Sequence, residues 1–333
     1  MIMASVKTMQ TAIGGGKNRV AWIDNVRFFA ILFVMLGHVL GMLTTEELPQ
    51  TDVIQSFIVA FNMPLFFFVS GYVGGKLLKV DGLKNLWDII KKAGLRMLLP
   101  AYSFTLLLML IQPVSNPLIY FWFLHSLFKL YVIVAAVSWG LYNVRLGEKT
   151  KFALLVLICL CLSYALGNYV VEFVIYFIMG MIAKRYGIFQ NVKIWRILVA
   201  MCIGIGIFAF TKDYSFYICK AKDMVKDMPH IWILRQICGL CFSYGLCGIF
   251  VLYSGRYSWF SQLGTMTLGF YLIHDYIVEM VMSGRFHIKL PLTEAWQWLL
   301  VFCFLVLLTA VCYATIRLLK INKYTRIIFL GEK

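Results

Sequence analysis

Long apolar runs extend from one end of this chain to the other, and they constrain its fold more than any other feature. Of the 333 residues, 62% are hydrophobic and only 14% are charged, whereas about a quarter of the residues in a soluble domain are charged. The few polar side chains cannot shield this much apolar surface from water. Lipid therefore has to cover it. The sequence therefore predicts one all-α membrane bundle without a separate soluble domain.

Apolar runs of about twenty residues are long enough to cross a bilayer as helices. We expect a polytopic bundle of about ten spans, at 22–43, 54–75, 97–113, 117–139, 152–167, 169–183, 194–211, 232–253, 263–282 and 297–316. Residues 1–21 would form a flexible N-terminal tail, 22–320 the membrane domain and 321–333 a C-terminal tail. Apolar and polar side chains separate onto opposite faces between 83 and 92, which predicts an amphipathic helix on the inner membrane surface. The segment 211–231 is either a solvated loop or a cover over an outer opening.

The basic residues are distributed unevenly between the connecting segments. The formal net charge is +16, and lysine and arginine concentrate in the segments that lie on the same side as the termini when ten spans are drawn. By the positive-inside rule, both termini are then cytoplasmic. Anionic lipid accounts for the basic charge, so we expect no nucleic-acid partner. All nine cysteines except Cys219 lie within apolar runs, which does not suggest a disulfide framework.

The first span carries three ionisable residues, which are costly inside a membrane and therefore indicate a site. Asp24 and Arg27 are three residues apart on one helical face, so they can pair. His38 lies eleven residues beyond Arg27, about three turns, and therefore points in nearly the same direction. The rise between them is about 16 Å, so Arg27 and His38 should have different roles. The alternative is a structural ion pair with a packing histidine.

Other predicted spans carry isolated polar groups. Ser70 and Gly71 in the second span favour close helix packing. His125 and Lys129 share a face of the fourth span, and Lys129 needs a partner, a cavity or a long path to the interface. His274, in the ninth span, is either a buried structural histidine or a catalytic one. These residues show no metal-ligand spacing, so we expect no metal.

Five sequence blocks resemble, in order, the acyltransferase-3 family of integral membrane acyltransferases, and within it the fucose 4-O-acetylase-like sugar O-acetyltransferases. The likeness covers essentially the whole chain, and its blocks are 23–38, 61–72, 96–102, 122–124 and 271–274. The first block has a basic residue and a histidine separated by ten residues, here Arg27 and His38. The chain departs from the family pattern at Asn62, where histidine is frequent, and at Lys92, where a second arginine is frequent nearer to Arg96.

The resemblance implies an O-acetyltransferase of the bacterial cytoplasmic membrane. Such an enzyme would take acetyl from the co-substrate acetyl-CoA and transfer it to a hydroxyl of a sugar or cell-surface glycan, soluble or lipid-linked. His38 would be the catalytic histidine, with Arg27 as its motif partner. The expected site residues are, for catalysis, His38, Asp24 and Arg27; for acetyl-CoA, Arg27, Lys92 and Arg96; and for the acceptor or oxyanion, Asn62, Ser70, Tyr72, Trp122, His125 and His274.

Several alternatives stay open at the level of sequence. His38 could act as a general base or could carry the acyl group as an acyl-imidazole. The transferred group could be acetyl or another short acyl group, and the protein could be a monomer or a homodimer. A transporter or flippase for a polar lipid or glycan could use the same buried histidines as proton relays or ligands. A structural scaffold would leave the buried charges without a role.

Overall fold

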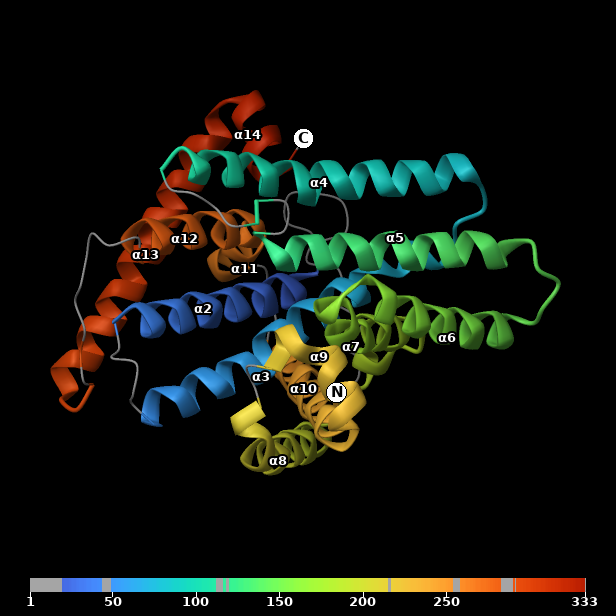
Figure 1. The fold of residues 1–333 in the computed structure, drawn as a ribbon, viewed down its shortest axis with the longest axis horizontal. Helices are drawn as coiled ribbons and strands as arrows, with labels where there is room; N and C mark the ends of the chain where they lie inside the picture. Colours follow the sequence, from blue (N-terminus) through green and yellow to red (C-terminus); the bar gives the residue numbers. More distant parts are fainter. Residues whose placement is uncertain are drawn as a thin grey trace, which may run out of the picture.

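A computed structural model describes residues 20–43, 49–111, 116–117, 120–214, 217–253, 258–282, 290 and 292–332. These residues form a helical bundle and contain no β-strand (Figure 1). The α-helices are α2 (Ala21–Leu43), α3 (Pro49–Val73), α4 (Leu83–Met109), α5 (Trp122–Tyr142), α6 (Glu148–Leu166), α7 (Asn168–Arg185), α8 (Ile194–Thr211), α9 (Ala221–Asp227), α10 (Pro229–Tyr253), α11 (Trp259–Gly264), α12 (Thr267–Met282), α13 (Ala295–Ile321) and α14 (Lys323–Leu330). Short 3₁₀ turns follow α3 (Gly74–Leu78) and α7 (Ile188–Gln190) and lead from α8 into α9 (Lys212–Tyr214, Tyr217–Lys220). The predicted tail 1–21 lies almost wholly outside the described residues.

Every predicted span falls on a helix, which confirms the polytopic helical bundle. Seven helical segments in the described chain are long and apolar enough to cross a membrane: those that include α2, α3, α5, α6, α8, α10 and α13. The other three predicted spans fall on helices with identifiable departures. The helix α4 begins with charged residues, α7 contains Glu172, Lys184 and Arg185, and α12 has only 16 residues. The count of ten spans and the side of the termini stay predictions.

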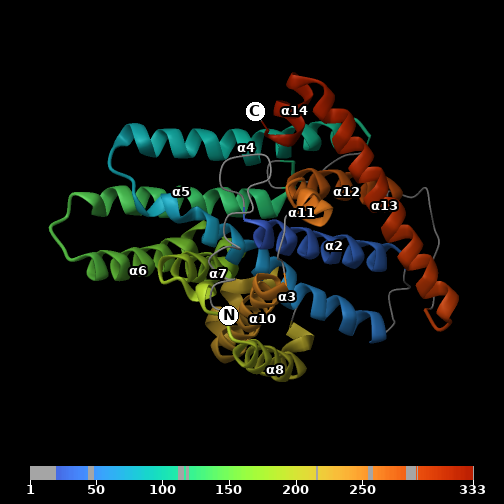
Figure 2. The same cartoon turned by 180° about the vertical axis from the view of Figure 1, so that it is seen from behind.

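The helices differ in how much of their surface other helices cover. At least half of the apolar stretch is buried in α2, α3 and α5, but less than a quarter in α6, α8 and α13. In both views α13 runs obliquely along the side of the bundle, and α2 lies between α5 and α3 (Figures 1 and 2). An apolar helix that other helices surround belongs to the core, whereas an apolar helix with a bare face suits contact with lipid. Of the ionisable residues of α2, Asp24 is therefore enclosed by protein, whereas His38 is exposed.

Two glycines bring α3 and α7 into backbone contact, as the sequence at Ser70 and Gly71 led us to expect. A Cβ at Gly71 would collide with the carbonyl of Phe177, and one at Gly180 would collide with the carbonyl of Phe68. Small residues permit this approach because association inside a membrane depends on tight packing. The contact fixes α7 against the helix that lines the candidate site.

The amphipathic segment 83–92 is not a separate surface helix, which corrects the sequence prediction. It is the beginning of α4 and continues without interruption into the third predicted span. Gly94 is the only glycine near the junction, and a single glycine weakens a helix by about 1 kcal/mol without ending it. The apolar face still exists, because Leu83 and Trp87 are each 65% exposed and are available to lipid.

The ninth predicted span, 263–282, is interrupted near its start. The helix α11 ends at Gly264, and α12 begins at Thr267. The Thr267 hydroxyl donates a hydrogen bond of 2.6 Å to the Gly264 carbonyl, which satisfies a backbone acceptor that the interruption frees. Such irregular backbone is tolerated at membrane depth where protein surrounds it.

The segment 211–231 and the predicted C-terminal tail both contain helices. In 211–231, α9 packs against α7 and α10, with Ala221 and Met224 buried. After the last span, α14 packs against α4; its N-cap residue Asn322 accepts a 2.8 Å hydrogen bond from the Tyr324 amide.

Candidate active site

The first turns of α2 are fixed to α11 through polar and backbone contacts. The Asp24 carboxylate lies 3.5 Å from the Arg27 guanidinium, with the Asp24 side chain 6% exposed, which confirms the expected pairing. The Ser261 hydroxyl donates a 2.7 Å hydrogen bond to the Asn25 side chain. Gly264 lies directly against the Asp24 carbonyl, so that no Cβ would fit there. These contacts set the position of Arg27 at this end of the bundle.

Arg27 and Arg96 lie near the same residue of α5. Both guanidinium groups are within electrostatic range of the partly buried Tyr131 side chain, although they come from α2 and α4. Lys92 lies one turn before Arg96, is largely exposed, and pairs with Asp88 at 4.0 Å. The structure therefore groups two of the three cations that the sequence assigned to acetyl-CoA, and it leaves the third on the surface of α4.

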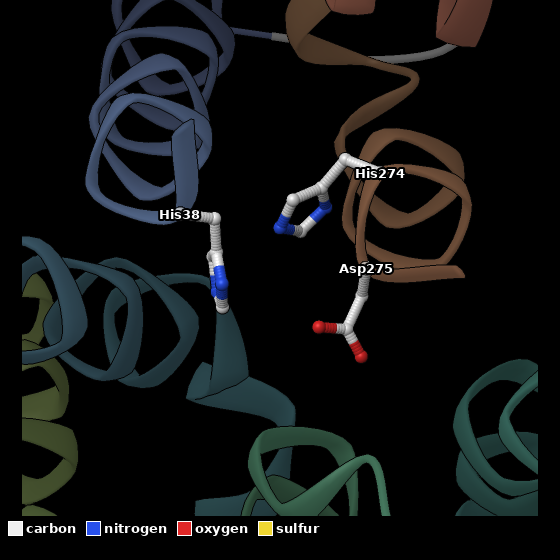
Figure 3. A group of neighbouring side chains, drawn as sticks. All are labelled: His38, His274 and Asp275. Carbon is white, nitrogen blue, oxygen red and sulfur yellow. The ribbon is translucent and has the colours of Figure 1, made fainter. Parts of the chain in front are cut away.

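His38 meets two side chains of α12 at the other half of α2. The rings of His38 and His274 have centroids 5.2 Å apart, and Asp275 follows directly on α12. One ligand-type atom from each of His38, His274 and Asp275 lies within 4.8 Å of the others. Figure 3 shows the three side chains extending into the space between the two helices.

A cavity of about 430 Å³ adjoins His38, a volume typical of small-molecule sites. His38 is exposed and lines this cavity. The wall combines apolar, aromatic and polar side chains from α2, α3, α5, α12 and the segment before α5: Val34, Gly37, His38, Gln55, Ile58, Val59, Asn62, Met63, Tyr120, Trp122, Tyr271 and Asp275. Such a wall can hold a polar acceptor.

Of the residues predicted for the acceptor site, Asn62 and Trp122 line the same cavity as His38. The Trp122 indole stacks on Tyr169 with centroids 4.4 Å apart, which fixes its orientation. Because His274 contacts His38, the structure brings three of the six predicted acceptor or oxyanion residues to His38.

Tyr72 and Ser70 lie at the opposite end of the bundle. The Tyr72 ring packs against Trp22 at 5.2 Å and lies under the Lys184 ammonium. Trp22 precedes His38 by sixteen residues on one helix, a rise of about 24 Å. A role for Tyr72 or Ser70 in stabilising an oxyanion at His38 is therefore inconsistent with this geometry, because such a donor must lie within about 3 Å.

His125 and Lys129 make contacts of their own on α5. The His125 Nδ1 lies 2.9 Å from the Phe121 carbonyl, and the ring packs against Tyr102 of α4. The Lys129 ammonium donates a 3.3 Å hydrogen bond to the Leu166 carbonyl at the end of α6. A partner thus accounts for Lys129, which was one of the three options.

Sequence reasoning did not include several groups that the fold places at the site. Asp275 was visible as the neighbour of His274, and Glu279 follows it one turn later. Gln55 and Tyr120 also line the cavity. The Tyr120 phenol donates a hydrogen bond to the Glu279 carboxylate. Polarity near the ends of predicted spans was the available signal, but it is weak because many interfacial residues are polar.

A helical membrane bundle that presents one histidine to a cavity and two arginines at a distance from it suits an acyl-transfer enzyme of the membrane. The model of the acyltransferase-3 family, described as an acyltransferase domain, matches residues 20–316, and the chain belongs to that family. No curated protein and no solved structure matched the chain. Family membership makes the protein a multi-pass membrane acyltransferase and argues against the transporter alternative.

Proposed function

We propose that the protein is an O-acetyltransferase that moves acetyl from acetyl-CoA to a hydroxyl of a sugar or cell-surface glycan. The observation that carries this proposal is the position of His38 at the wall of the 430 Å³ cavity. An imidazole is suited to the chemistry because its ordinary pKa lies near 6.5, so it can accept and return a proton at neutral pH.

The cavity offers contacts that match a polyhydroxylated acceptor. Gln55 and Asn62 carry amide groups that both donate and accept hydrogen bonds. The fixed indole of Trp122 provides an apolar face of the kind that packs against a sugar ring. Because the wall is mixed and not uniformly apolar, a sugar suits it better than a fatty chain.

The donor would approach from the end of the bundle where Arg27 and Arg96 converge. Guanidinium groups bind phosphate oxygens through paired hydrogen bonds, and coenzyme A carries several phosphates. The rise of about 16 Å from Arg27 to His38 suits the extended pantetheine arm that joins the phosphates to the thioester. Lys92 is exposed on α4 and can add electrostatic attraction there.

In the direct reaction, the acceptor O–H proton passes to His38 while the oxygen attacks the thioester carbon. The new C–O bond forms, the C–S bond breaks, and the coenzyme A sulfur takes the proton from His38. In the two-step alternative, His38 accepts the acetyl group as an acyl-imidazole before the acceptor hydroxyl attacks it. Both routes end with the same two products and an unchanged enzyme.

The test compares His38→Ala with wild type and with His230→Ala, a change at an exposed histidine at the start of α10. Mass spectrometry of surface glycans from cells expressing each form reports the gain of one acetyl mass. We expect His38→Ala to lower product formation by about 10²–10⁴-fold, the usual contribution of a general base, while His230→Ala stays at the wild-type level. Near-normal product from a well-expressed His38→Ala protein would refute the catalytic role.

A further inference from the structure

His274 has a tautomer that its hydrogen bonding determines. Its Nδ1 lies 2.7 Å from the Phe270 carbonyl one turn earlier on α12. A carbonyl oxygen can only accept, so Nδ1 carries the proton and the Nε2 of the neutral ring is an acceptor. The side chain is fully buried, and Nε2 has no hydrogen-bond partner among the described residues. A buried acceptor without a partner is costly, so Nε2 requires a donor.

His38 is the neighbour that can supply this donor. Its ring packs at 5.2 Å and an interplanar angle of 64° from that of His274, and the facing atoms lie within 4.8 Å. An N–H of His38 can therefore reach Nε2 after a small shift or through one bridging water. His125 has the same bond to a preceding carbonyl but faces Tyr102, so the carbonyl bond alone does not define the pair.

Asp275 adds a negative charge beside the same imidazole. It lines the cavity together with His38, and its carboxylate belongs to the group within 4.8 Å. A proton taken up by His38 creates an imidazolium in a space of low dielectric, where a nearby carboxylate stabilises it strongly. Glu279, which is hydrogen-bonded to Tyr120, also lies within electrostatic range of His38. Asp275 is the carboxylate that lines the cavity wall together with His38.

We propose that α12 positions the catalytic histidine: His274 accepts a hydrogen bond from His38, and Asp275 balances the charge of its imidazolium. This inference rests on the proposed function and extends it to two positioning residues. During transfer, one nitrogen of His38 takes the acceptor proton while its other N–H donates to His274. The proton then leaves to the coenzyme A sulfur, so His274 and Asp275 begin and end the cycle in the same protonation state.

The same three side chains could instead hold a divalent cation, because two imidazoles and a carboxylate form a common zinc-ligand set. A bound zinc ion would occupy the lone pair that His38 needs as a base. Metal content therefore distinguishes the two arrangements directly.

The experiment uses the full-length protein in detergent with acetyl-CoA and a glycan preparation that the wild type acetylates. The variants are His274→Phe, which has no acceptor, His274→Gln, which restores an acceptor oxygen, and Asp275→Asn, which removes the charge. His230→Gln is the matched control. We expect His274→Phe and Asp275→Asn to lower kcat by about tenfold or more, but by less than His38→Ala does. The KM for acetyl-CoA should stay within twofold of wild type, and His274→Gln should recover most of the loss.

Three results would overturn the proposal while leaving acetyl transfer by this protein intact. The first is a wild-type kcat in both His274→Phe and Asp275→Asn. The second is equal impairment of His274→Phe and His274→Gln with a matching fall in Tm, which would show a purely structural role. The third is stoichiometric zinc in wild type that is lost in the variants, which would replace this proposal with a metal site. Absence of acetylation by the wild type would instead refute the proposed function.

Discussion

Glu172 and Arg235 form a buried ion pair whose disruption should destabilise the bundle measurably. The Arg235 guanidinium lies 2.8 Å from the Glu172 carboxylate, and the two side chains are only 10% and 3% exposed. The Trp232 indole donates a further 3.0 Å hydrogen bond to the same carboxylate. Arg235→Ala would leave this buried carboxylate without its countercharge.

The magnitude follows from burial. Removing one partner of a buried pair costs about 3–5 kcal/mol, whereas replacing both partners by apolar residues of similar volume is often neutral or stabilising. A change of 1 kcal/mol shifts Tm by about 2–4 °C in a large domain, so Arg235→Ala should lower Tm by roughly 6–20 °C. The double variant Glu172→Leu with Arg235→Met should recover much of this loss.

The assay is thermal unfolding of the detergent-purified protein, followed by tryptophan fluorescence. Glu148→Ala is the matched control: it removes an ion pair with Arg185 in which Glu148 is 82% exposed, and such pairs contribute at most about 1 kcal/mol. A Tm for Arg235→Ala within about 2 °C of wild type would contradict the reasoning. So would a double variant that is no more stable than the single one.

Two further predictions concern the donor site and helix packing. Arg96→Ala should weaken acetyl-CoA binding by about tenfold or more, because it removes hydrogen bonds to a charged group that are worth about 1.5–3 kcal/mol; an unchanged dissociation constant by calorimetry would exclude Arg96 from the donor site. Gly180→Ala should lower Tm, because the new methyl group collides with the Phe68 carbonyl and overpacking costs about 1–3 kcal/mol. Gly140→Ala, where nothing lies within 4 Å of the added carbon, should leave Tm unchanged or raise it, and equal losses in both variants would contradict the packing argument.

Local features of this chain were predictable because they depend only on residues that are close together within one helix. Apolar runs located the helices, and the three-residue spacing of Asp24 and Arg27 predicted their ion pair. The resemblance to a family singled out His38. By contrast, the interruption at residues 265–266 was missed, because no proline within 263–282 marks the break.

The sequence by itself determined that this chain forms a membrane bundle with buried ionisable groups on its first helix. Only the tertiary structure decided which groups meet: His38 with His274 and Asp275, and Glu172 with Arg235. These partners are separated by 63 to more than 230 residues in the chain. Helical periodicity fixes which face a side chain occupies, but it does not fix which other helix that face contacts. That choice depends on backbone contacts such as Gly71 with Phe177 and Gly264 with Asp24, because close approach at a few small residues sets the position of each whole helix.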